Sequence, residues 1–145
     1  MKIIGTGSAH PTCAVTNQML EQFLETTDEW ITERTGIKER CVISSEHLED
    51  MAVHAANKAL EDAGLTAADI DFLICSNVVN EYVTPALSCI IQGKLGAKCP
   101  TVDINAACAG FIYAMDMADD KLKAGKAKNI LIENMKTEAK AEADA

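Results

Sequence analysis

The residue with the clearest capacity for chemistry is Cys108, which lies in the stretch TVDINAACAGFIYAMDMADD. The beginning of this stretch is predicted to form a short strand, and the apolar run after Gly110 has the pattern of a helix. A thiol at such a junction is close to the free N–H groups and the positive dipole end of the helix, which lower a thiol pKa and favour the reactive thiolate. The pattern therefore indicates a candidate nucleophile at a strand-to-helix turn.

Only small residues flank Cys108 in the sequence. Alanine occupies the two preceding positions and the next one, and Gly110 follows, so the turn leaves room for a substrate carbonyl. Backbone N–H groups in the turn could also stabilise an oxyanion, as in a nucleophile elbow with sulfur in place of oxygen. The alternative is a buried cysteine in a tight helix–sheet contact, which the same small residues would suit. Spacing alone does not separate these two interpretations.

The other cysteines indicate neither a disulfide framework nor a metal site. No two of the six cysteines have the C-x-x-C spacing, and no cluster of metal ligands can be recognised. We expect most of them to be small buried hydrophobic residues, namely Cys41, Cys75, Cys89 and Cys99. Cys13 follows a proline and is predicted to lie in a loop.

The rest of the chain is predicted to alternate strands with helices. Strands are expected at about residues 1–4, 40–43, 71–76, 101–104 and 129–132, and helices at about 17–24, 28–36, 47–63, 85–95 and 110–125. The helix at 47–63 has the clearest amphipathic period and ends at Gly64. Such alternation is typical of an α/β protein with a largely parallel sheet and helices on both faces.

Composition excludes several classes of protein. The chain has 145 residues, of which 48% are hydrophobic and 24% charged, as in a globular domain with a core and unlike a disordered segment. Its net charge of −9 argues against nucleic-acid and anionic-membrane partners, which require a basic face. No apolar run approaches the roughly 20 residues that span a bilayer. No secretory signal follows Met1, so a cytoplasmic protein is expected.

Several motifs, in order and at fitting spacings, resemble one family. KIIGTGSAHP, TTDEWITERTGIKER, ALEDAG and DINAACAGF are similar to the N-terminal part of bacterial β-ketoacyl-acyl-carrier-protein synthase III. The resemblance runs from about Lys2 to Ile132. It implies a thiolase-like fold, in which two similar α/β halves pack as a five-layered sandwich. Residues 1–132 would form one such half, and the charged segment 133–145 would be a helical or disordered tail.

The resemblance also implies an activity and its partners. The family condenses an acyl-CoA, typically acetyl-CoA, with malonyl-acyl carrier protein and so initiates fatty-acid biosynthesis. The expected partners are therefore an acyl-CoA, acyl carrier protein and a second copy of the chain in a dimer. CoA thioester would be a substrate, with no permanently bound cofactor.

The family's site residues match four positions. Cys108 matches the nucleophile that becomes acylated, and Trp30 matches the aromatic residue that stacks on the CoA adenine. Arg34 matches the basic residue that pairs with a CoA phosphate. Thr26 lies beside the same nucleotide site. The residue types suit these roles, because indole offers a flat face to a base and guanidinium a fork to phosphate. The alternative for Trp30 is a core aromatic on a short helix.

The sequence departs from the family in three places. The His and Asn that complete the family's catalytic site belong to a second half, and no matching motif is present, so the chain alone is expected to be inactive or only self-acylating. The segment after Ile132 does not follow the family. Thr84 stands where many relatives carry a Phe that reaches the acyl pocket of the partner, which leaves the acyl-chain preference open.

Two other functions compete with the enzyme. The chain could be a non-catalytic half-domain that binds CoA or a partner and assembles with itself or with a complementary half. A nucleotide-binding protein that uses Gly5-Thr6-Gly7 is the weaker alternative, because the rest of the dinucleotide fingerprint is missing. The uncharged run 106–115 favours assembly, because a lone half would expose an apolar helix face.

Overall fold

The computed structural model describes residues 1–78, 80 and 82–135, so most of the predicted tail lies outside the described residues. The chain divides into two compact units. The sheet unit contains Met1–Ala9 and the chain from Glu49 onward, and the hairpin unit is His10–Leu48. Each unit is considered by itself.

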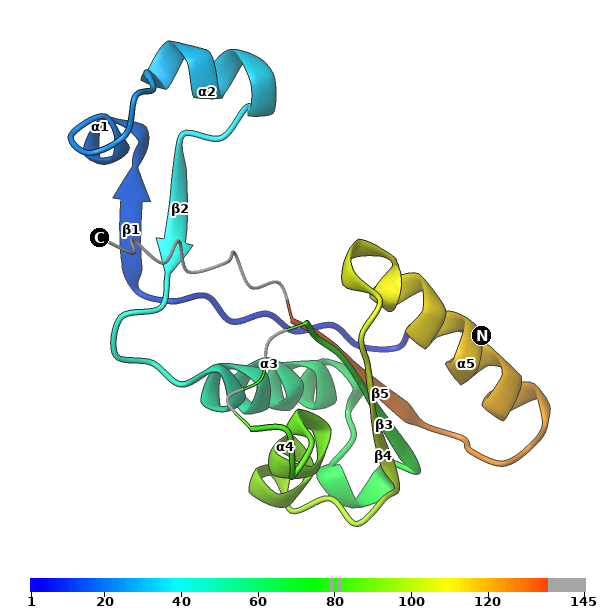
Figure 1. The fold of residues 1–145 in the computed structure, drawn as a ribbon. Coiled ribbons are helices and arrows are strands. Elements are labelled where there is room, and N and C mark those ends of the chain that lie inside the picture. Colours follow the sequence, from blue (N-terminus) through cyan, green and yellow to red (C-terminus); the bar gives the residue numbers. More distant parts are fainter. Residues whose placement is uncertain (79, 81, 136–145) are drawn as a thin grey trace. The chain divides into compact units, whose positions relative to one another are not determined.

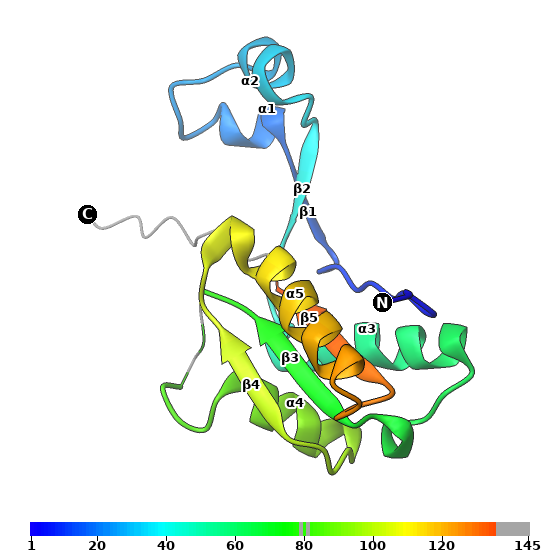
Figure 2. The ribbon, with the colours of Figure 1, turned by 90° about the vertical axis from the view of Figure 1, so that its right-hand side faces the viewer.

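Three parallel strands form the centre of the sheet unit. They are β3 (Phe72–Ser76), β4 (Thr101–Ile104) and β5 (Ile130–Asn134), in the order β4-β3-β5. Helix α5 (Gly110–Lys123) covers one face, and α3 (Leu48–Ala63) and α4 (Leu87–Leu95) lie on the other (Figure 2). A short 3-10 helix, Ala67–Asp69, precedes β3. The predicted α/β architecture with helices on both faces is confirmed.

Alanines allow α5 to approach the sheet closely. Ile74 of β3 packs with Ala114 and Ala118 of α5, and all three are at most 1% exposed. Because side chains alternate along a strand, Leu73 and Cys75 point to the opposite face, where α4 buries Leu87 and Ile91. The core therefore lies on both sides of β3, as its uninterrupted apolar sequence predicts.

Asp103 joins the sheet to the start of α4. Its Oδ1 accepts a hydrogen bond from the Ser88 N–H at 2.9 Å, and its Oδ2 accepts from the Leu87 N–H at 3.0 Å. The Asn77 side-chain amide also donates to Oδ2 at 3.0 Å. The residue before the helix, Ala86, provides no side-chain cap, so a strand carboxylate satisfies the free N–H groups of α4.

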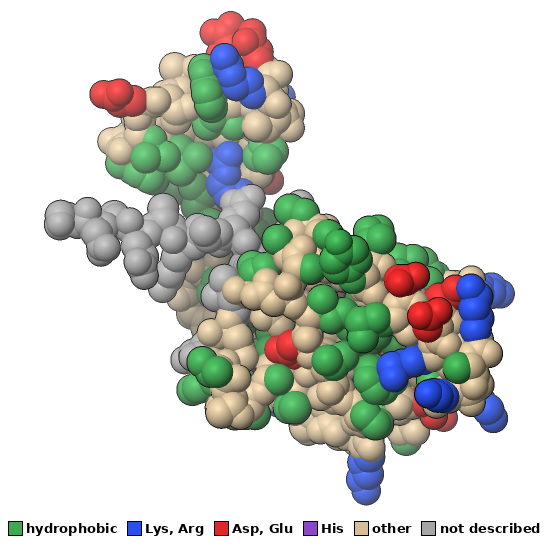
Figure 3. Space-filling model, turned by 45° about the vertical axis from the view of Figure 1, so that its right-hand side comes forward, with side chains coloured by type: hydrophobic (Ala, Val, Ile, Leu, Met, Phe, Trp, Pro, Cys, Tyr) green, Lys and Arg blue, Asp and Glu red, His purple; other side chains and the backbone are tan. Residues whose placement is uncertain are grey.

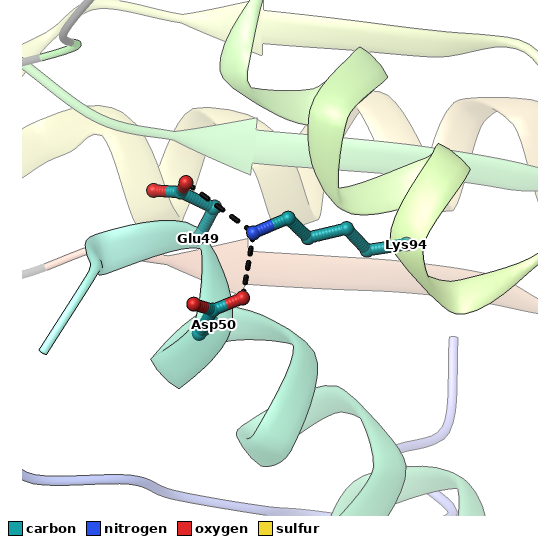
Figure 4. A network of polar contacts seen from close by, with 3 residues as sticks. All are labelled: Glu49, Asp50 and Lys94. Atoms are coloured by element: carbon teal, nitrogen blue, oxygen red, sulfur yellow. Dashed lines mark hydrogen bonds and ion pairs between the residues drawn. The ribbon is translucent and has the colours of Figure 1, made fainter.

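Ion pairs connect α4 to the first turn of α3. The Lys94 ammonium lies 2.6 Å from an Asp50 oxygen and 3.3 Å from a Glu49 oxygen (Figure 4). The hydrogen bond to Asp50 is the main cause of a raised Lys94 pKa. Both carboxylates also lie at the positive end of α3, where negative charge is favourable.

The hairpin unit is built on a two-stranded antiparallel ladder. It consists of β1 (Cys13–Thr16) and β2 (Glu39–Val42), with α1 (Asn17–Leu20) and α2 (Asp28–Thr35) at one end (Figure 1). At the other end Glu46 accepts hydrogen bonds from Thr12 and Ser44, which flank the ladder. These bonds hold the Glu46 pKa below its usual range, and the bond from the Thr12 side chain has the largest effect. One carboxylate therefore closes the base of the hairpin.

The N-terminal segment differs most from expectation. Residues 1–4 form no strand, and Ile3 and Ile4 remain exposed. Burial of these two side chains therefore does not favour pairing of the segment with a sheet. The segment instead passes close to α3, because a Cβ on Gly5 would collide with the Ala59 carbonyl oxygen. A Cβ on Gly7 would likewise meet the backbone of α3. The G-T-G motif is thus explained by close packing and not by a phosphate loop.

Other element bounds also differ. The helix expected at 17–24 ends at Leu20, because the following N–H groups of Gln22 and Phe23 bond to carbonyls three residues back and form turns. Strand β1 was not predicted, and β5 continues past Ile132 to Asn134. Among the described residues, no helix is long and apolar enough to cross a membrane.

Candidate active site

Cys108 is exposed at the start of a helical segment. It is the middle residue of a short 3-10 helix, Ala107–Ala109, which continues directly into α5 at Gly110. The buried-cysteine alternative therefore does not describe this residue. The sulfur lies next to the end of α5 that carries the positive dipole.

The backbone before Cys108 is strained. Ala107 has φ of 45°, in the left-handed region that residues with a Cβ rarely adopt. This conformation costs about 1–2 kcal/mol, and such strain is concentrated at functional sites. Alanine carries no sequence signal for it, so only the structure reveals a sharp elbow directly before the candidate nucleophile.

Gly110 brings the start of α5 against the sheet. A Cβ at this position would collide with the side chain of Ser76, the last residue of β3. The first turn of α5 contains no acidic residue, and no side chain caps it. No carboxylate of that turn therefore opposes the positive end of the α5 dipole, although the Gly110 N–H already donates to the Ala107 carbonyl.

The remaining five cysteines differ in their exposure. Burial raises the Cys75 pKa to about 12, and burial also raises the Cys99 pKa. Cys41 and Cys89 are exposed, contrary to expectation, because each lies on the solvent side of a surface element. Cys13 is half-buried in β1 and not in a loop, because it pairs with Val42 of β2.

Helix α2 brings two of the other predicted site residues together. The Trp30 side chain is 52% exposed, so it is not a core aromatic. The Arg34 guanidinium lies 4.4 Å from the centre of the Trp30 ring, in a cation–π contact one turn along the helix. The Thr27 hydroxyl caps α2 by accepting from the Trp30 N–H at 3.1 Å. An aromatic face and a cation are thus displayed side by side.

Thr26 lies directly before the residue that caps α2. Its hydroxyl oxygen is buried and has no hydrogen-bond partner among the residues that the structure describes. A buried hydroxyl without a partner is uncommon and is consistent with a place for a ligand atom. Thr26, Trp30 and Arg34 belong to the hairpin unit and Cys108 to the sheet unit, so each set is described within its own unit.

Sequence reasoning missed one ionisable residue close to the sheet centre. Glu133 is only 6% exposed and pairs in register with Cys75 of β3, although its position was assigned to the charged tail. Burial raises its carboxyl pKa to about 7. The local sequence Ile132-Glu133-Asn134 contains no signal for the burial of Glu133. That burial depends on the helices packed against the sheet.

Comparison with known proteins identifies the family to which the sequence is similar. Residues 31–144 match the family described as Thiolase, N-terminal domain. Curated relatives include the β-ketoacyl-[acyl-carrier-protein] synthase III of Clostridium perfringens strain SM101, which is 48% identical over 97% of this chain. The Aquifex aeolicus protein of the same name is 46% identical over 90% of it. The chain spans only 44% and 43% of these two relatives.

Solved structures have the same fold. The crystal structure of 3-oxoacyl-[acyl-carrier-protein] synthase III from Aquifex aeolicus gives a TM-score of 0.89 at 46% identity, covering 92% of this chain and 44% of that one. The priming β-ketosynthase of the R1128 polyketide pathway gives a TM-score of 0.86 at 37% identity, covering 90% and 40%. The described residues therefore have the thiolase-like arrangement.

Proposed function

We propose that this chain, which belongs to the thiolase family, is the nucleophile-bearing half of a β-ketoacyl-acyl-carrier-protein synthase III. The observation that carries the proposal is an exposed Cys108 at the start of α5, directly after a strained elbow. The strain and the uncapped helix start give the sulfur both access and a favourable field. The names of the relatives support the class of reaction.

The first step of the proposed reaction uses groups of this chain alone. The Cys108 thiolate attacks the carbonyl carbon of an acyl-CoA thioester, and the new C–S bond gives a tetrahedral oxyanion. The positive end of the α5 dipole stabilises that negative charge. The intermediate collapses with loss of the CoA thiolate and leaves the acyl group on Cys108.

The nucleotide part of CoA is proposed to bind on α2. Trp30 offers the exposed part of its indole to adenine, and Arg34 provides a cation for a phosphate. The unpartnered Thr26 hydroxyl adds a hydrogen bond beside them.

Condensation with malonyl-acyl carrier protein is proposed to need more than this chain. By the family resemblance, a His polarises the thioester and an Asn stabilises the carbanion that remains when malonyl loses carbon dioxide. Neither role matches a residue here, and relatives are more than twice as long as the matched region. We therefore infer self-acylation without efficient condensation for the isolated chain.

Alkylation by iodoacetamide at neutral pH separates a nucleophile from a merely exposed thiol. We expect Cys108 to react several-fold faster than the exposed Cys41 and Cys89. Cys41 lies in a strand, and the first turn of α4, which contains Cys89, is bonded to the Asp103 carboxylate, whereas no carboxylate caps the start of α5. Cys75 and Cys99 should react slowest, because burial raises their pKa values and depletes thiolate. Peptide-resolved mass spectrometry gives each rate. Equal rates for Cys108, Cys41 and Cys89 would favour a binding domain without catalysis.

An exposed apolar face supports the second candidate function, assembly of a half-domain. Several apolar side chains of α5 face solvent, and apolar side chains gather over this part of the sheet unit (Figure 3). They are Phe111, Ile112, Tyr113 and Met117, which are 37–62% exposed. Contiguous apolar surface of this kind marks an interaction site in most proteins.

We expect the purified chain to associate through this α5 face. Light scattering coupled to size exclusion at low micromolar concentration should give a mass above that of one chain. Ile112→Glu, at a position that is 62% exposed, should shift the mass toward the monomer without unfolding the chain. A sharp monomer peak for the parent chain would exclude association through this face.

A further inference from the structure

A buried polar network lies beneath α2 in the hairpin unit. Its central residue is Asn17, which is completely buried although it is polar. The Asn17 Oδ1 accepts a hydrogen bond from Arg40 Nη2 at 2.7 Å. The Asn17 Nδ2 donates to Asp28 Oδ1 at 2.7 Å and to the Ile37 carbonyl at 2.8 Å. The amide thus connects a cation on β2 to an anion on α2.

The network reaches every element of the hairpin unit. Asn17 is the first residue of α1, Asp28 is the first residue of α2, and Arg40 lies in β2 and also donates to the Val15 carbonyl of β1 at 3.2 Å. The Asn17 N–H bonds to the Lys38 carbonyl at 3.1 Å. A single side chain therefore fixes both helices to the ladder.

Helix α2 has little else to hold it. None of its eight residues is buried, so hydrophobic packing contributes little to its orientation. Its polar attachments are the bonds that Asn17 donates to Asp28 and, at 3.5 Å, to the Thr32 hydroxyl, and the Asp28 N–H, which donates to Glu21 Oε1 at 2.6 Å. Orientation of a helix without a buried face must then come from these directional bonds.

We propose that Asn17, Asp28 and Arg40 are positioning residues, which orient α2 so that Trp30 and Arg34 present one preformed surface to the CoA nucleotide. The inference rests on the proposed function, in which those two side chains bind CoA. Asp28 precedes Trp30 by two residues on the same helical turn, so a rotation of the first turn moves the indole directly. A buried, fully bonded amide favours one orientation over others.

An exchange of the amide and the carboxylate tests the proposal. Asn17→Asp faces the Asp28 carboxylate with a second anion and removes the donor, so the affinity for free CoA should fall about tenfold. Asp28→Asn keeps an oxygen that accepts from Asn17 but loses the negative charge, so it should lower the affinity less than Asn17→Asp does. The double variant Asn17→Asp/Asp28→Asn restores a donor–acceptor pair and keeps the bond to Arg40, but the Ile37 carbonyl loses its donor. It should recover part of the lost affinity.

Two readouts and one control make the outcomes distinct. Calorimetric titration with CoA gives the affinity, and Trp30, the sole tryptophan of the chain, reports the orientation of α2 through its near-ultraviolet circular dichroism. Gln22→Glu makes the same amide-to-carboxylate change at an exposed position and should alter neither readout. The Trp30 spectrum should change in Asn17→Asp and return in the double variant.

Each result decides a separate question. If the parent chain binds CoA and Asn17→Asp binds it equally well with an unchanged Trp30 spectrum, the positioning role is overturned. If the parent does not bind CoA, the proposed function fails, and the Trp30 spectra still test the orientation of α2. If Asn17→Asp loses its structure, the double variant decides. A folded double variant with weak CoA binding and an altered Trp30 spectrum would overturn the proposal.

Discussion

Incubated with acetyl-CoA, the chain is expected to gain one acetyl group on Cys108, and Cys108→Ala is expected to lose this labelling. The rate of acetylation should fall at least about tenfold, which corresponds to about 1.4 kcal/mol in the barrier. The reason is local, because the helix start, the strained Ala107 and the small neighbours all belong to the same turn. Peptide-resolved mass spectrometry over time measures the rate.

The matched control is Cys89→Ala. Cys89 is also an exposed thiol of the sheet unit, and it lies in the first turn of α4, where the Asp103 carboxylate already accepts from the Leu87 and Ser88 N–H groups. Its removal should leave the acetylation rate unchanged. Equal labelling of Cys108→Ala and the parent would remove Cys108 as nucleophile. A parent chain without any acetylated cysteine would show that the attack needs groups outside this chain.

Glu133→Gln is expected to stabilise the chain at pH 8 and to leave it almost unchanged near pH 4. The folded-state pKa of Glu133 is raised from 4.5 to about 7 by burial. Below about pH 4.5 the carboxyl is protonated in both states. As the pH rises towards 7, the unfolded chain releases its proton while the folded chain keeps it, so the parent loses stability. Above pH 7 both states are ionised and the loss is complete.

The expected size of this effect is large for one side chain. The rise of the Glu133 pKa from 4.5 to about 7 corresponds to about 3 kcal/mol of lost stability at pH 8. Two groups lie beside Glu133 on the same face of the sheet. Cys75 pairs with it and has a pKa of about 12, so it stays neutral in this range, and Asp103 lies one strand further.

Urea unfolding of the parent and the variant at pH 5 and pH 8 measures the difference. The free energy of unfolding of Glu133→Gln, relative to that of the parent, should increase by about 2 kcal/mol from pH 5 to pH 8. Comparison with Glu61→Gln, an exposed carboxyl of α3, removes effects of net charge, and that variant should show no such growth. An advantage that is independent of pH would mean that folding does not raise the Glu133 pKa.

Local chemistry is the part of this molecule that could be predicted most reliably. Gly36 and Gly96 end their helices with φ of 71° and 75°, as the positions of these glycines indicate. The apolar run of β3 and the period of α3 were also recognised, because each pattern depends on a single element. The prediction of a strand at residues 1–4 was wrong. Whether Ile3 and Ile4 join a sheet depends on an available edge strand nearby and not on their own β propensity.

The sequence by itself determined that Cys108 lies where a strand turns into a helix, and that Trp30 and Arg34 lie one turn apart on a short helix. Both follow from spacing along the chain. Only the tertiary structure decided that Ala107 is strained, that Glu133 is buried, and that a single asparagine fixes α2. The reason is physical. Strain, desolvation and buried hydrogen bonds depend on groups distant in sequence, which only the packed chain brings together.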